Sequence, residues 1–166
     1  MTYHSADSLD LPTRQRNAMQ AARMLADRAE QGLPIEWSPA LSVGLESIDG
    51  QHRVLVAYIN QLSSAILRGQ PGSVLGQVLS GLDGYTRIHF RHEERLFKMH
   101  GWDEGTEHAD THRAFERQLQ DFQQRFATGD TSLAMAVMKF MIQWLGEHIL
   151  LDDMAYSPFL KEHGVR

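Results

Sequence analysis

Five histidines and two carboxylates recur along this chain at spacings that match the turns of α-helices. His89 and Glu93 are four residues apart, and so are His108 and His112. Residues four apart on an α-helix lie on the same face, with Cβ atoms roughly 6 Å from each other. A chain with this pattern must accommodate polar side chains on the inner faces of several helices at once. The full set comprises His52, His89, Glu93, His108, His112, His148 and Asp153.

The apolar residues around this set predict four amphipathic helices joined by short turns. Their expected ranges are 48–67, 73–99, 106–127, and 131 to beyond 153. The third helix shows the pattern best, because its inner positions follow alternating steps of four and three residues. Those positions are His108, His112, Phe115, Leu119, Phe122 and Phe126. Four helices with short connections predict an all-α fold, an up-down-up-down four-helix bundle.

This helix order places all seven polar residues at one end of the bundle. The second half of helix 73–99, the first half of helix 106–127 and the second half of the last helix meet there, together with the start of the first helix. We therefore expect one polar cluster in an otherwise apolar core. A single histidine in an apolar row is usually a hydrogen-bonded core residue, but seven polar residues at one level are not explained by packing.

Asp153 is the one member whose spacing does not fit a regular α-helix. It follows His148 by five residues, which at about 3.6 residues per turn places it about 140° around the helix. A local widening of the helix, or a frayed end, would bring Asp153 back toward the core. Such bulges occur frequently at functional sites. We expect one of these departures near Asp153.

The side chains in this cluster are suited to a metal site. Imidazole and carboxylate together favour iron or manganese, whereas a soft-metal site would need sulfur ligands, and this chain has no cysteine. Two ferrous ions with two carboxylates and one hydroxide would leave a net charge of about +1, which a small anion would neutralise. The Glu-x-x-His motif of ferritin-like bundles does not occur. The zinc motif HExxH fails as well, because His92-Glu93 is followed by Leu96.

Composition argues against several other classes of protein. With 16 Lys and Arg against 21 Asp and Glu, the net charge is −5, so no nucleic-acid partner is expected. No apolar run of about 18 residues occurs, so no membrane-spanning segment is expected. The N-terminus lacks the apolar stretch of a secretory signal. The absence of cysteine is compatible with a reducing compartment, and we expect a cytoplasmic protein.

The N-terminal part of the chain predicts an appendage to the bundle. Residues 13–31 show a weak apolar stripe typical of a helix, and residues 35–47 predict an ordered loop laid on the bundle. The stripe comprises Ala18, Ala22, Leu25 and Ala29, and Gly32 and Pro34 end the helix. We therefore divide the chain into an extension, residues 1–34, and a four-helix domain, residues 35–166.

Four short motifs together resemble those of bacterial hemerythrins. They are IDGQH, HFRHE, HADTH and HILLDD in chain order, with Trp37 upstream. The resemblance covers about residues 35–160. It implies a non-haem di-iron centre with an oxo or hydroxo bridge, held in a four-helix bundle that binds O2 reversibly.

The same resemblance implies how the histidines divide between two irons. His108, His112 and His148 would hold one iron and complete its coordination. His52 and His89 would hold the other, which keeps an open position for O2. In the oxidised form, that position would accept a small anion such as azide.

The resemblance also implies roles for the carboxylates and for the residues around the open position. Glu93 and Asp153 would bridge both irons, and Trp144 and Leu145 would wall the O2 pocket. Glu94 is the residue we expect to block the open position if azide fails to bind.

Three functions are compatible with these residues. The first is reversible O2 binding for storage or delivery. The second is an O2 or redox sensor that signals through the extension, with self-association or partner contact through residues 13–31. The third is an enzyme, such as a peroxidase or an NO-reducing protein, which we do not expect because the sequence shows no substrate pocket and no acid–base pair beyond the metal ligands. The remaining histidines, namely His4, His92, His100 and His163, are expected at the surface.

Overall fold

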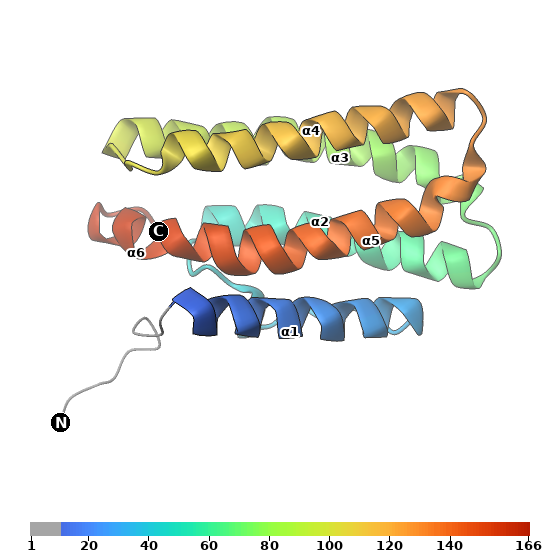
Figure 1. Ribbon diagram of the computed structural model, residues 1–166, viewed down its shortest axis with the longest axis horizontal. Coiled ribbons are helices and arrows are strands. Elements are labelled where there is room, and N and C mark those ends of the chain that lie inside the picture. The colour runs from blue at the N-terminus through green and yellow to red at the C-terminus, as the bar shows by residue number, and fades with distance from the viewer. Residues whose placement is uncertain (1–10) are drawn as a thin grey trace.

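The computed structural model describes residues 11–166, and the regular structure in that range is entirely helical. Figure 1 shows α2, α3, α4 and the run from α5 to α6 as four rods, with α1 along the outside. The predicted all-α bundle with an extra N-terminal helix is confirmed. Within residues 11–166, no helix is both long and apolar enough to cross a membrane. The elements in chain order are α1 (Leu11–Glu30), the 3-10 turn η2 (Pro39–Leu41), α2 (Glu46–Leu67), α3 (Gly72–His100), α4 (Gly105–Ala127), the 3-10 turn η3 (Thr131–Leu133), α5 (Ala134–Trp144), the π-helix η4 (Leu145–Asp153) and α6 (Met154–Glu162).

An apolar core fills the space between the four rods. In it α2 packs on α3 and α5, and α3 packs on α4. A Cβ atom at Gly81 would lie 2.4 Å from the Tyr58 ring, so this glycine permits the close approach of α2 to α3. Glycines end some of the helices. Gly101 ends α3, because its φ of 72° is in the left-handed region that glycine adopts readily. Apolar residues of α2 and α3 are buried in the core, among them Leu55, Ile59, Leu62, Leu75, Val78 and Leu82. The predicted inner positions of α4 are buried except Phe126, which is half-buried.

The last rod changes from α-helix to π-helix at the level of the polar cluster. In a π-helix the backbone hydrogen bonds span five residues, so residues five apart return to nearly the same side. His148 and Asp153, which have this spacing, are therefore both buried inside the bundle. The predicted widening of the helix is confirmed. It also rotates the inner face, so that Leu151, which a regular helix would turn inward, is only half-buried while Ile149 is fully buried.

The helix α1 lies against α5, α2 and η4, along the side of the bundle away from α4 (Figure 1). Its small inward residues permit close contact, and Ala18 and Ala29 are buried. The apolar stripe predicted for this helix therefore packs on its own bundle. The connection to α2 is ordered, because Asn60 donates a hydrogen bond to the Ile35 carbonyl and accepts one from the Ile35 amide.

Candidate metal centre

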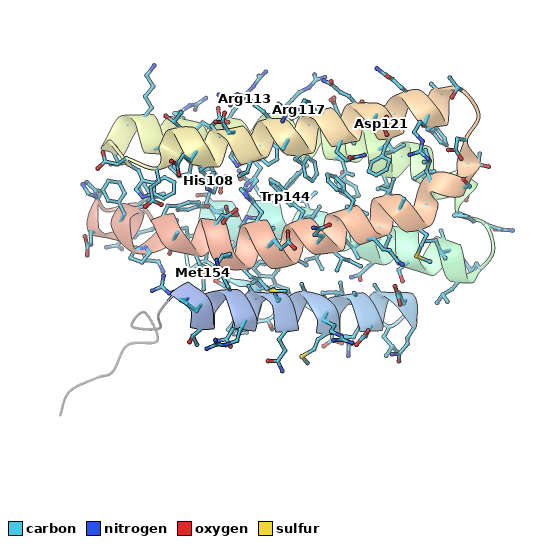
Figure 2. The ribbon with its side chains drawn as sticks, viewed as in Figure 1. His108, Arg113, Arg117, Asp121, Trp144 and Met154 are labelled. Carbon is cyan, nitrogen blue, oxygen red and sulfur yellow. The ribbon has the colours of Figure 1, made fainter. Side chains whose placement is uncertain are left out.

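Four segments of the bundle carry the seven polar residues to one level of the core. α2 supplies one histidine, α3 one histidine and one glutamate, α4 two histidines, and η4 one histidine and one aspartate. In Figure 2, His108 lies in the interior between α4 and the last rod, whereas Arg113 and Arg117 point outward from the same helix. None of the seven residues is more than 5% exposed; they are His52, His89, Glu93, His108, His112, His148 and Asp153.

The seven side chains form two overlapping groups, each with the geometry of a metal site. In each group, the potential ligand atoms lie within 4.8 Å of one another. One group contains three histidines and a carboxylate: His108, His112, His148 and Glu93. The other contains two histidines and two carboxylates: His52, His89, Glu93 and Asp153. We call these the three-histidine and the two-histidine half.

The carboxylate of Glu93 faces both halves. Its Oε2 atom lies 3.0 Å from Nε2 of His112 and 3.3 Å from Nε2 of His108. Its Oε1 atom lies 3.5 Å from Nε2 of His89 in the other half. Because each oxygen meets a different group of histidines, Glu93 is disposed to bridge two cations.

The carboxylate of Asp153 is shared between the halves in the same way. Its Oδ1 atom lies 3.2 Å from Nε2 of both His108 and His148. Its Oδ2 atom lies 3.0 Å from Nε2 of His52 and 3.9 Å from Nε2 of His89. The two carboxylates thus contribute one oxygen each to each half.

Many of these inward-facing atoms lack hydrogen-bond partners. Nε2 of four histidines and both oxygens of Asp153 are buried without a hydrogen bond among the described residues. Buried polar atoms are almost always satisfied in folded proteins, so this concentration at one point calls for a missing partner. Two metal cations between the Nε2 and carboxylate atoms would provide it. The four histidines are His52, His89, His112 and His148.

The outward nitrogens of three histidines are held by polar side chains. Nδ1 of His89 lies 2.8 Å from Oε1 of Gln51, and Nδ1 of His112 lies 3.1 Å from Oε1 of Glu94. Nδ1 of His148 lies 3.1 Å from Oδ2 of Asp152. An Nδ1–H that donates to these oxygens leaves Nε2 as the lone-pair nitrogen, which is the form a metal ligand requires.

Aromatic rings pack directly on the histidines and keep water from them. Phe90 stacks on His112 with ring centroids 3.9 Å apart, and Trp144 stacks on His148 at 3.8 Å. Tyr85 stacks on His89 at 4.9 Å. These rings fix the orientation of the imidazoles and lower the local dielectric, which strengthens every charge interaction inside.

The sequence also matches a family model described as Hemerythrin HHE cation binding domain, over residues 43–160. The chain belongs to the hemerythrin family. It is 31% identical over 127 residues to a bacteriohemerythrin of Stenotrophomonas maltophilia, and this alignment covers 76% of the chain and 82% of that protein. It is also 31% identical over 120 residues to a bacteriohemerythrin of Pseudomonas aeruginosa strain LESB58, with 72% and 77% covered. A hemerythrin-like protein of Naegleria gruberi is 32% identical over 127 residues, with 76% and 94% covered.

In this hemerythrin-family site, the pKa values of His89, His108 and both buried carboxyls are shifted from their ordinary values in the metal-free protein. Burial lowers the pKa of His89 to about 3, so that histidine stays neutral. Burial opposes the charge on His108 as well, but the nearby carboxylates of Asp153 and Glu93 outweigh this and raise its pKa to about 10. Burial alone would raise the pKa of both carboxyls; the surrounding histidines instead hold each below its ordinary value. The pocket therefore favours two carboxylates that need cationic partners.

The sequence did not predict which side chains hold the outward nitrogens of the histidines. Gln51, Glu94 and Asp152 each precede or follow a member of the seven in the chain, and that adjacency was the only signal for them. Glu94, expected to be able to block the open position, contacts the outward nitrogen of His112 in the other half. Tyr156 of α6 donates a hydrogen bond to Oε1 of Glu93.

The other histidines lie away from the centre. His92 is partly exposed and its Nε2 lies 3.1 Å from Oγ of Ser47. His100 and His163 lie near each other, with ring centroids 5.6 Å apart, and His163 is exposed. His4 lies outside the described residues.

Proposed function

We propose that this protein binds O2 reversibly at a di-iron centre held by the seven buried residues. The observation that carries the proposal is the unequal supply of ligand atoms. The three-histidine half offers three imidazoles and one oxygen from each carboxylate, whereas the two-histidine half offers only two imidazoles and the same two oxygens. With a shared solvent bridge, one six-coordinate ion would be complete and the other would keep an open position. The bound irons would supply that position and the electrons for O2.

The chain's own residues favour binding over turnover of a substrate. The ligand set is mainly neutral imidazole, which leaves little negative charge to stabilise high-valent iron. The aromatic rings of Phe90, Trp144 and Tyr85 exclude water from the histidines. In this proposal, Trp144 and the fully buried Leu145 wall the space beside the open position. We therefore propose a binding protein for O2 storage or delivery rather than an enzyme.

Metal analysis with an anion titration tests the proposal. Protein expressed with sufficient iron should contain two irons per chain, and azide should shift the visible charge-transfer bands of its oxidised form. One iron per chain, or zinc at full occupancy, would refute the two-ion reading. Two irons with a spectrum that azide leaves unchanged would mean that no position is open.

A second candidate, an O2 or redox sensor, is favoured by one contact. Ala22 of α1 packs directly on Gly146 of η4: a Cβ atom added to Gly146 would lie only 2.1 Å from the Cβ of Ala22. The η4 segment also carries His148 and Asp153, so a change at the centre would reach α1 directly. In this alternative, residues 1–34 are an appendage that reports the state of the iron.

Gly146→Ala tests this connection. The new Cβ would also lie 3.0 Å from the Cα of Ala22, so α1 must move, at a cost of roughly 1–3 kcal/mol. We expect α1 to become sensitive to limited proteolysis while both irons remain. The matched control is Gly84→Ala, where a Cβ meets nothing within 4 Å and helix propensity favours alanine by about 1 kcal/mol. An altered autoxidation rate in Gly146→Ala alone would support the sensor, and an unchanged rate with a displaced α1 would refute it.

A further inference from the structure

Tyr85 carries a buried hydroxyl with no hydrogen-bond partner among the residues that the structure describes. It lies one turn before His89 in α3 and is only 5% exposed. The other tyrosine at the centre, Tyr156, differs in this respect, because its hydroxyl donates to Glu93. An unsatisfied buried hydroxyl lowers stability, and phenylalanine at this position would avoid that cost. The hydroxyl of Tyr85 therefore calls for a partner that is not part of the chain.

The position of Tyr85 indicates which part of the centre that partner would occupy. Its ring stacks on His89 with an interplanar angle of 23°, and His89 belongs to the half with fewer ligand atoms. The Trp144 indole N–H faces the Tyr85 hydroxyl, although neither buried group makes a hydrogen bond of regular geometry within residues 11–166. These two groups thus lie where the halves meet, because Tyr85 stacks on His89 of the two-histidine half and Trp144 stacks on His148 of the three-histidine half.

The chemistry of the two groups permits them to act in sequence. An indole N–H can only donate, whereas a phenol can accept one hydrogen bond and donate another. A small rotation would let Trp144 donate to the Tyr85 oxygen, which leaves the Tyr85 proton for a second acceptor. A hydrogen bond received by a hydroxyl strengthens the one that it donates.

We propose that the Tyr85 hydroxyl, supported by Trp144, donates a hydrogen bond to a small anion or other acceptor ligand held at the two-histidine half. This inference rests on the proposed function, because it takes the open position to be on that side. The Tyr85 hydroxyl thereby increases the affinity for the ligand and does not contribute to the stability of the fold.

Tyr85→Phe in the iron-loaded, oxidised protein tests this with azide as the probe. We expect azide to bind roughly tenfold more weakly, as for the loss of one hydrogen bond. In wild type, the azide stretching band should shift when H2O is replaced by D2O, and this shift should be lost in Tyr85→Phe. The metal-free variant should melt at or above the temperature of metal-free wild type, because only an unsatisfied hydroxyl has been removed.

Tyr156→Phe is the matched control, because it removes the phenol whose hydroxyl already has a partner. It should lower the melting temperature of the metal-free protein, in contrast to Tyr85→Phe. Equal azide affinity and an equal deuterium shift in wild type and Tyr85→Phe would overturn the proposal. A lower melting temperature of metal-free Tyr85→Phe would overturn it too, because the hydroxyl would then be structural. Failure of wild type to bind iron or azide would instead refute the proposed function.

Discussion

Alanine at His52 or His89 is expected to abolish O2 binding, whereas alanine at His112 should leave a protein that still binds O2 but autoxidises faster. The first two residues are the two imidazoles that the described part of the chain supplies to the two-histidine half. Removing either one leaves an ion with a single histidine, so its affinity should fall by more than the roughly 10–100-fold typical of residues that only orient a ligand. His112→Ala leaves two histidines in its half, with a vacancy that water can fill.

Iron content per chain and the visible spectrum after O2 addition distinguish these variants. His52→Ala and His89→Ala should hold about one iron or fewer, and His112→Ala should hold more. His92→Ala is the control, since this histidine is partly exposed, and its effect on stability should stay within about 0.5 kcal/mol. If His92→Ala lost iron while His89→Ala kept it, the assignment of ligands on α3 would be wrong.

Removal of iron is expected to destabilise the whole bundle. A ligand that binds only the folded state at a thousand times its Kd adds about 4 kcal/mol of stability. For a chain of this size, that corresponds to roughly 10 °C in melting temperature for each ion. Chelation should therefore lower the melting temperature of the purified protein, and added ferrous iron should restore it. Identical melting curves before and after complete removal of iron would contradict a structural role for the metal.

The metal-free protein should be most stable near pH 6.5. Burial holds the pKa of His89 at about 3, well below its ordinary value of 6.5. Between pH 6.5 and 3 the unfolded chain therefore binds a proton that the folded protein excludes, so the free energy of unfolding decreases as the pH is lowered. The pKa of His108 is raised to about 10, so between 6.5 and 10 the folded protein keeps a proton that the unfolded chain loses, and stability falls as pH rises. Denaturant unfolding at several pH values measures this. A steady rise in stability from pH 6.5 to 10 would contradict the raised pKa.

The fold and the position of the polar cluster could be predicted because both depend on periodicity. The steps of four and three residues in α4 define its inner face, and short turns define the order of the helices. A departure at Asp153 was predictable too, since a spacing of five from His148 is compatible with a shared face only if the helix widens or frays, and the π-helix shows that it widens.

Other features left no periodic signal. The docking of α1 depends on the contact of Ala22 with Gly146, and small residues in a weak stripe do not show what they pack against. The partner of Tyr156 could not be predicted, because its contact with Glu93 joins residues 63 apart in sequence. The half-buried position of Leu151 could not be predicted either. The extent of the π-helix decides which residues after His148 turn inward, and spacing alone does not fix that extent.

The most direct test of the central claim is an O2 titration of the reduced, iron-loaded protein, followed by removal of the gas. We predict uptake of one O2 for every two irons, and full recovery of the reduced spectrum under argon over repeated cycles. Uptake without recovery would show that the centre consumes O2, and no uptake by a protein with two irons per chain would show that the two-histidine half offers no open position. Either result would contradict reversible O2 binding.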